Sequence, residues 1–193
     1  GVFLYNSSFI SISHSNFSYS ELHSVYLFKS SHNTFQDNYL SYPEDQSLLY
    51  LYDTCVNNTF VGNDLFYTQS NYYEGVNLDL NCHNNTFYKN NLTDIGDYGI
   101  YLYNNCDNNN FTENFINKTR RYDGIYMAME CNNNIFSENI IQDCQRYGIY
   151  LNDRCHNNSF NLNEIRDCSG TSAIYLYNQC QNSSFIDNII YET

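Results

Sequence analysis

Residues 99–117 read Gly-Ile-Tyr-Leu-Tyr-Asn-Asn-Cys-Asp-Asn-Asn-Asn-Phe-Thr-Glu-Asn-Phe-Ile-Asn, and variants of this stretch return along the whole chain. The most regular part is Cys-x-Asn-Asn-x-Phe, whose phenylalanines are spaced by 24 to 27 residues: Phe9, Phe35, Phe60, Phe87, Phe111, Phe136, Phe160 and Phe185. A period of this length is typical of one supersecondary unit that stacks on copies of itself. The repeat therefore predicts a solenoid, in which a functional site must lie on a face, in a loop or at an end.

One copy of the repeat predicts three short strands. Ile100 and Leu102 alternate with Tyr101 and Tyr103, which is the period of a half-buried strand. An Asn-rich corner follows, Phe111 begins a second strand, and a further corner leads to a third. Three strands and two tight polar corners describe one coil of a parallel β-helix. We expect the right-handed form, because parallel crossovers favour that hand.

The same positions recur in successive copies and predict columns of like residues. About eight coils form a single all-β domain over residues 1–193, with aliphatic side chains and Phe inside. Asparagine follows seven of the eight phenylalanines at a distance of three residues, as Asn38, Asn63, Asn90, Asn114, Asn139, Asn163 and Asn188. Asparagine tolerates the left-handed backbone of a sharp corner, and stacked amides can bond along a column.

Composition excludes several classes of function. The net charge is -13, with only eight Lys and Arg residues, so we expect no binding to nucleic acid or to anionic membranes. No stretch of 18 apolar residues occurs, so we expect no membrane insertion. The chain starts directly in a repeat, without the charged and apolar segments of a signal peptide.

The pattern Gly-Ile-Tyr-Leu-Tyr-Asn-x-Cys-x-Asn-Asn-x-Phe-x-x-Asn-x-Ile resembles the repeat of NosD-like and related carbohydrate-binding and sugar-hydrolase (CASH) β-helix proteins. It has Cys where a small polar residue is usual, and it covers nearly all of the chain. The resemblance implies the fold. It leaves function open, because this superfamily includes lyases, hydrolases, epimerases, surface adhesins and accessory proteins of metal maturation.

The eight cysteines fall into two columns. Six lie on consecutive coils, namely Cys55, Cys82, Cys106, Cys131, Cys155 and Cys180, and two others, Cys144 and Cys168, lie on adjacent coils. Neighbouring strands place Cα atoms within disulfide range, and the simplest pairing is 55–82, 106–131, 155–180 and 144–168. Each bridge would contribute about 3 kcal/mol. The alternative is a column of buried free thiols that act as small apolar side chains.

A straight column of sulfurs does not offer the tetrahedral ligands of zinc. His83 and His156 each follow a cysteine, but they lie three coils apart and cannot share an ion. We interpret both as ordinary surface histidines. We therefore predict no metal site and no cofactor.

Asn-x-Ser/Thr sequons predict sites for N-linked glycans if the chain passes through a glycosylating host. They occur at Asn6, Asn16, Asn57, Asn84, Asn91, Asn110, Asn117, Asn157 and Asn182. Several arise because the Asn-Asn-x-Phe corner often carries Ser or Thr, so coincidence is the competing explanation. Acidic charge, sequons and possible disulfides together favour an extracellular or cell-surface location.

The best local candidate for chemistry is a charged loop with Lys118, Arg120, Arg121 and Asp123. Asp94 and Asp97, one coil earlier, could add the carboxylates that a pectate-lyase-like calcium site needs. The alternative is a solvated loop of mixed charge. The polygalacturonase signatures, nucleophile elbows, phosphate loops and His-Glu-x-x-His are absent from the sequence. We therefore assign no catalytic residue.

The outward positions of the first strand form a strip of tyrosines along one side of the solenoid. Its members are Tyr50, Tyr52, Tyr101, Tyr103, Tyr126, Tyr150, Tyr175 and Tyr177. Such an aromatic surface could stack on sugar rings or pack against another chain. Stabilisation of the sheet by cross-strand contacts is the competing explanation.

The chain opens within a first strand and stops where the next copy of the repeat would begin, so a second copy could continue the solenoid in phase. We therefore predict a secreted structural protein, not an enzyme, that stacks head to tail with itself into an extracellular filament or surface fibre. A fragment of a longer repeat protein would have the same ends. The alternative function is a carbohydrate-binding or polysaccharide-cleaving, pectate-lyase-like protein with glycans as partners. A third is a NosD-like accessory of metal maturation.

Overall fold

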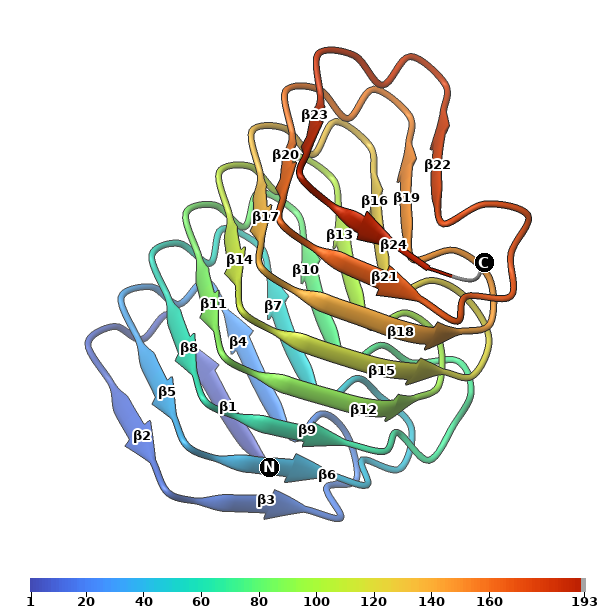
Figure 1. Ribbon diagram of the computed structural model, residues 1–193. Coiled ribbons are helices and arrows are strands. Elements are labelled where there is room, and N and C mark those ends of the chain that lie inside the picture. Colours follow the sequence, from blue (N-terminus) through green and yellow to red (C-terminus); the bar gives the residue numbers. More distant parts are fainter. Residues whose placement is uncertain (192–193) are drawn as a thin grey trace.

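The computed structural model describes residues 1–191, which wind into stacked coils (Figure 1). These residues form 24 strands and no helix. The strands make three parallel sheets of eight strands each, and consecutive strands of the chain always enter different sheets. This arrangement confirms the predicted all-β solenoid with three strands per coil. None of the described residues forms a helix long and apolar enough to cross a bilayer.

Each coil contributes one strand to each sheet. The first sheet contains β1 (Val2–Tyr5), β4 (Val25–Phe28), β7 (Leu49–Tyr52), β10 (Val76–Asp79), β13 (Ile100–Tyr103), β16 (Ile125–Ala128), β19 (Ile149–Asn152) and β22 (Ile174–Tyr177). The second contains β2 (Ser11–Ser13), β5 (Thr34–Gln36), β8 (Thr59–Val61), β11 (Thr86–Tyr88), β14 (Asn110–Thr112), β17 (Ile135–Ser137), β20 (Ser159–Asn161) and β23 (Ser184–Ile186). The third contains β3 (Asn16–Ser18), β6 (Tyr39–Ser41), β9 (Asp64–Phe66), β12 (Asn91–Ile95), β15 (Phe115–Thr119), β18 (Ile140–Cys144), β21 (Glu164–Arg166) and β24 (Ile189–Ile190).

The interior follows from the two-residue period of the strands. In β13, Ile100 and Leu102 are buried while Tyr101 and Tyr103 face outward. The phenylalanines of the second sheet stack on one another through the core. For example, the rings of Phe111 and of the next coil's phenylalanine lie 4.8 Å apart and nearly parallel. Because every coil repeats the same pattern, the apolar core is continuous along the axis.

The prediction that Phe9 belongs to the phenylalanine column is wrong. Phe9 is 80% exposed and has a left-handed backbone (φ 62°), and its ring lies on His32 outside the core. Ile12 is the residue paired with Phe35 in the sheet. The first coil is shorter than the others, so equal spacing in the sequence does not lead to the same column.

Two columns of buried asparagines hold the corners together, as predicted from the repeat. In the second column, Asn114 Oδ1 accepts hydrogen bonds from the backbone N and side-chain Nδ2 of Asn90, both at 3.0 Å. Its own Nδ2 donates to the carbonyl oxygen of Phe87 at 3.0 Å and to Asn139 Oδ1 at 3.1 Å. The left-handed backbone lies one residue earlier than expected, at Glu113 (φ 53°). The asparagine therefore serves as the bonding residue of the corner.

Candidate functional site

The outer face of the first sheet carries the predicted tyrosine strip. All eight predicted members lie on outward positions of β7, β13, β16, β19 or β22. The rings contact one another between coils: the centroids of Tyr101 and Tyr126 are 5.3 Å apart, and those of Tyr150 and Tyr175 are 5.0 Å apart. Such distances are those of favourable aromatic pairs. The strip therefore stabilises the sheet and also presents a row of partly exposed aromatic side chains.

The strip is larger than the sequence analysis predicted. Tyr26 and Phe28 on β4 extend it, with Tyr26 stacked on Tyr50 at 5.2 Å. Tyr98, from the loop before β13, stacks on Tyr101 at 5.3 Å and on Tyr126 at 4.8 Å. The alternating Val-Tyr-Leu-Phe at residues 25–28 was a usable signal for β4. Nothing in the local sequence indicated that the loop tyrosine joins the strip.

An acidic cluster lies beside the strip, where the loops before β13, β16 and β19 stack. Asp123, in the loop before β16, is fully buried, and Arg146, from the next loop, binds it through two bonds. The distances are 2.9 Å from Nε to Oδ1 and 2.6 Å from Nη2 to Oδ2. The backbone N of Tyr147 also donates to Asp123 Oδ1, at 2.9 Å. Burial raises the pKa of Asp123, while Arg146 opposes that shift. This carboxylate is therefore a structural anchor for the loops.

Within residues 1–191, Asp97 is the member of the cluster that has an oxygen without a hydrogen-bond donor. Its side chain is only 8% exposed, and among the described residues none donates a hydrogen bond to its Oδ1. Burial, followed by the charge of Glu74, raises the pKa of Asp97 to about 7, although Arg121 acts in the opposite direction. A carboxyl group with a pKa near neutrality can both give and take a proton under ordinary conditions. The arrangement can therefore support acid–base chemistry next to an aromatic platform.

The structure divides the charged loop predicted at residues 118–123. Lys118 Nζ lies 3.0 Å from Asp94 Oδ2, and Arg120 Nε lies 3.6 Å from Asp94 Oδ1. Asp94 and Lys118 lie on strands of the third sheet, and Lys118 and Arg120 border a cavity of about 200 Å³ together with Asp143. Asp97 and Asp123 belong to the other group, beside the first sheet. The predicted single site is therefore two separate groups.

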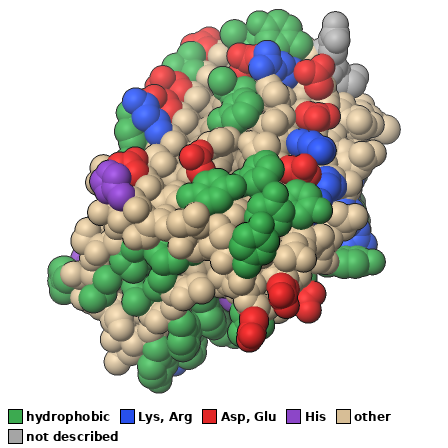
Figure 2. All heavy atoms as spheres, turned by 90° about the horizontal axis from the view of Figure 1, so that it is seen from below, with side chains coloured by type: hydrophobic (Ala, Val, Ile, Leu, Met, Phe, Trp, Pro, Cys, Tyr) green, Lys and Arg blue, Asp and Glu red, His purple; other side chains and the backbone are tan. Residues whose placement is uncertain are grey.

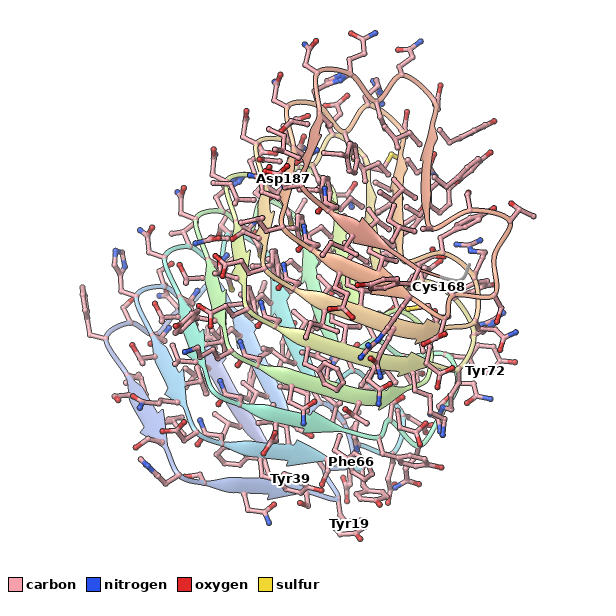
Figure 3. All side chains as sticks on the ribbon, in the orientation of Figure 1. Tyr19, Tyr39, Phe66, Tyr72, Cys168 and Asp187 are labelled. Atoms are coloured by element: carbon pink, nitrogen blue, oxygen red, sulfur yellow. The ribbon has the colours of Figure 1, made fainter. Side chains whose placement is uncertain are left out.

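Seven of the eight Lys and Arg side chains lie within 4 Å of an Asp or Glu oxygen, whereas the acidic side chains are in excess. On the face in Figure 2, Lys and Arg side chains gather along one side next to Asp and Glu side chains. Arg121 lies over the rings of Tyr72 and Tyr122, at 4.6 and 4.7 Å from Cζ to the ring centroids. Tyr72 projects from the long loop between β9 and β10 (Figure 3). Within residues 1–191, no group of three or more His, Cys, Asp or Glu side chains is placed to hold a metal ion.

The structure describes all eight cysteines as free thiols, of which seven are buried. Cys106 Sγ donates to the carbonyl oxygen of Tyr103 at 3.1 Å, and Cys131 Sγ donates to that of Ala128 at 3.1 Å. Burial raises the pKa of both thiols. This geometry is that of small buried side chains, whereas the predicted disulfide pairing is not present and stays a prediction for oxidising conditions.

The sequons lie at different depths on the surface. Asn57, Asn84 and Asn157 share one exposed corner and have a left-handed backbone. Asn6, Asn16 and Asn182 are exposed as well, while Asn91, Asn110 and Asn117 are partly buried. The side chain of Asn57 contacts His32, at 3.1 Å from Nδ2 to Nε2. Attachment of glycans stays a prediction at all nine positions.

His83 and His156 lie at the surface, and each also accepts a hydrogen bond from the backbone of the next coil. His83 Nδ1 accepts a hydrogen bond from the backbone N of Asp107 at 3.1 Å, and His156 Nδ1 accepts one from that of Gln181 at 3.1 Å. Both histidines therefore belong to a column of side chains that bind backbone N–H groups of the next coil. Each is a surface residue with a structural role.

Two family models cover the chain. Residues 1–128 match the right handed beta helix region, and residues 68–193 match the periplasmic copper-binding protein NosD. Each match covers more than half of the sequence, so the chain belongs to the right-handed β-helix family and to the NosD family. The predicted hand and the predicted resemblance are both confirmed. No curated protein sequence matches the chain.

Solved structures with the same fold are carbohydrate-modifying enzymes. A mutant of the periplasmic alginate epimerase AlgG has a TM-score of 0.79 and 15% identity, covering 94% of this chain and 50% of that protein. The A-module of the mannuronan C-5 epimerase AlgE6 from Azotobacter vinelandii has a TM-score of 0.54 and 15% identity, covering 89% of this chain and 59% of that one. At such identities the similarity shows the fold. The chain spans about half the length of the AlgG structures.

These neighbours change two of our predictions. The prediction that the chain is not an enzyme is contradicted, because solved structures that share its fold include alginate and mannuronan epimerases. The comparisons also agree better with a carbohydrate-active protein than with a structural filament. Head-to-tail self-association stays a prediction.

The copper named in the NosD family description does not fit the described residues. Thiolates are suitable copper ligands, but Cys82, Cys106 and Cys131 in the long column are buried and donate to backbone carbonyls, and burial raises the pKa of all three thiols. His83 and His156 use Nδ1 for backbone N–H groups. We therefore derive no copper chemistry for residues 1–191.

Proposed function

We propose that the chain is an exported, carbohydrate-active β-helix enzyme that binds a polysaccharide along the tyrosine strip. The observation that carries the proposal is Asp97, a nearly buried carboxyl group with a pKa of about 7 next to that strip. Tyrosine rings suit sugars because their faces stack on pyranose C–H groups and their hydroxyls bond to sugar hydroxyls. The periplasmic location named for NosD and for AlgG supports export.

Asp97 is the proposed acid–base residue. Its neighbour in sequence, Tyr98, stacks on Tyr101 and Tyr126, so a sugar bound on these rings lies close to the carboxyl group. The ion pair of Asp123 and Arg146 holds the adjacent loops in place. At a pKa of about 7, Asp97 exists in both protonation states near neutral pH. Proton transfer at a bound sugar is therefore the step that this site can perform.

The experiment is a screen of purified protein against alginate, pectate, chitosan and neutral glucans. New reducing ends, unsaturated products and inversion of sugar carbons would be followed by colorimetry, ultraviolet absorbance and NMR. We expect one of these activities, with a dependence on pH centred near 7. Asp97→Asn should lower it by about 10²- to 10⁴-fold, as is typical for loss of a general acid or base.

The matched control is Asp94→Asn, which removes a carboxylate from the separate group next to the third sheet. We expect this variant to keep its activity. Wild-type protein that binds none of these polysaccharides, or full activity of Asp97→Asn, would contradict the proposal.

A further inference from the structure

The tyrosine strip is interrupted at β10. The column that contains Tyr50 and Tyr101 has Asn77 between them, and the column of Tyr52 and Tyr103 has Asp79. On either side the rings stack on their own neighbours, Tyr50 on Tyr26 at 5.2 Å and Tyr101 on Tyr126 at 5.3 Å. Among the described residues no aromatic pair spans β10. We call Glu74, Asn77 and Asp79 the polar step.

At the polar step, one strand lacks the aromatic rings that the strands on either side carry. Neighbouring parallel strands lie roughly 4.8 Å apart, so the tyrosines on β7 and β13 start about 9.6 Å from each other. Tyr52 and Tyr103 flank the half-buried Asp79 from the two sides. A sugar ring that rests on this part of the strip thus meets aromatic side chains at its edges and polar side chains beneath.

Asp79 is the carboxylate of the polar step that receives the fewest hydrogen bonds. Asp79 Oδ1 accepts a hydrogen bond from Asn104 Nδ2 at 3.0 Å, the single side-chain donor that the described residues give this carboxylate. Asn77 Oδ1 is buried, and no described residue donates to it. Glu74 Oε2 accepts from Ser47 Oγ at 2.6 Å and from Asn77 Nδ2 at 3.2 Å. A ligand for this place therefore brings hydrogen-bond donors.

The charge around the polar step restricts the chemical class of its ligand. The polar step contains two carboxyl groups, and Asp97 and Asp123 lie in the loops nearby. Arg146 is already bound to Asp123, and Arg121 lies on the rings of Tyr72 and Tyr122. A uronate would place its carboxylate against the carboxylate of Asp79, and the two like charges would repel each other. An amino sugar would instead place an ammonium group, a donor with positive charge, against Asp79.

We propose that the polar step is a subsite for a hexosamine unit, whose ring lies between Tyr52 and Tyr103 and whose ammonium group binds Asp79. The inference rests on the proposed function and specifies its substrate class as a glucosamine-containing polysaccharide. The alginate and mannuronan named for the structural neighbours are polyuronates, so this chain would differ from them in substrate charge.

Calorimetric titration with three hexasaccharides tests the subsite: glucosamine, N-acetylglucosamine and mannuronate, at pH 6 and 150 mM salt. We expect the glucosamine hexamer to bind at least about tenfold more tightly than the other two, because a charge-assisted hydrogen bond replaces solvent at Asp79. Asp79→Asn should lose about tenfold in affinity. Asn77→Tyr should lose a similar amount, because it completes the aromatic column and fills the polar step.

The control is Asp64→Asn, which removes the same charge from an exposed position on the third sheet. It should bind like the wild-type protein, and thermal unfolding should show that all three variants fold. Equal losses in Asp79→Asn and Asp64→Asn would indicate general attraction between an acidic protein and a polycation, and would overturn the subsite. Preferential binding of mannuronate or of N-acetylglucosamine would overturn the subsite but leave the proposed function standing. Absence of binding to all three hexamers, together with inactivity on every polysaccharide of the screen, would overturn both.

Discussion

At the scale of single residues, the contacts that a side chain makes with neighbouring coils determine its properties. Asp97 and Asp123 are both nearly or fully buried aspartates in stacked loops. Asp123 receives three hydrogen bonds, two from Arg146 and one from the backbone of Tyr147. Asp97 Oδ1 receives none from the described residues. Burial raises the pKa of both carboxyl groups, but Asp123 is held in an ion pair that opposes this shift, whereas Asp97 can exchange a proton.

The raised pKa of Asp97 predicts a specific dependence of stability on pH. The pKa rises from 3.8 to about 7 in the folded state, so between these values the folded protein holds a proton that the unfolded chain has released. The free energy of unfolding therefore falls as pH rises through this window and is lowest above pH 7. In Asp97→Asn the difference in unfolding free energy between pH 4.5 and pH 8 should shrink by about 2 kcal/mol.

Urea unfolding of the wild-type protein and Asp97→Asn at the two pH values measures this difference. His23, whose pKa is lowered to about 4 by burial, titrates in both proteins, so its contribution cancels. Asp64→Asn, at an exposed site, serves as control and should leave the difference unchanged. Parallel pH profiles for the wild-type protein and Asp97→Asn would show that Asp97 ionises normally.

At the scale of elements, the corners between the strands are held by hydrogen bonds from asparagine side chains. The strands are short, three to five residues in most cases, and are joined by corners with a left-handed backbone. Asparagine columns satisfy backbone groups that the corners would otherwise bury without partners. This explains why the repeat retains asparagine at the same place in coil after coil.

Asn114→Ala tests the importance of a corner column. The substitution leaves the backbone N of Asn90 buried without its partner and removes one hydrogen bond from the carbonyl oxygen of Phe87. A buried group without a partner costs about 1–3 kcal/mol, so the free energy of unfolding should fall by about this amount. Asn91→Ala is the control, because its side chain bonds at the exposed surface to Asp64, and it should change stability by less than about 0.5 kcal/mol. Equal effects in chemical denaturation would refute the structural role.

The whole molecule behaves as a one-dimensional stack. Each strand pairs with strands of the adjacent coils only, and all three sheets run through the described coils. Hydrophobic stabilisation is shared along the phenylalanine stack. Disturbance of one coil should therefore be felt by its nearest neighbours and fade beyond them.

Phe111→Ala examines this behaviour. Removal of a fully buried ring should lower the free energy of unfolding by about 3–5 kcal/mol. Amide hydrogen exchange should accelerate most in β14 and in its partners β11 and β17, while β5, three coils away, keeps its protection. Uniform acceleration across all coils would show instead that the solenoid opens as one cooperative unit.

The coil architecture could be predicted because it depends on local pattern. Alternation of Ile100 and Leu102 with Tyr101 and Tyr103 selects the buried face of a strand, and the spacing of phenylalanines and asparagines places each coil over the last. The exception, Phe9, lies in the shortest coil. Equal spacing in the sequence then no longer means the same position in space.

The candidate site depended on the tertiary structure. Asp97, Asp123 and Arg146 are more than 20 residues apart from one another in sequence and meet only because their loops stack. Lys118 and Arg120, close to Asp123 in sequence, bind Asp94 instead. Burial and neighbouring charge set the pKa of Asp97, and both come from adjacent coils. Periodic side chains therefore specify the scaffold, while proton affinity and ligand choice arise from contacts that no local pattern contains.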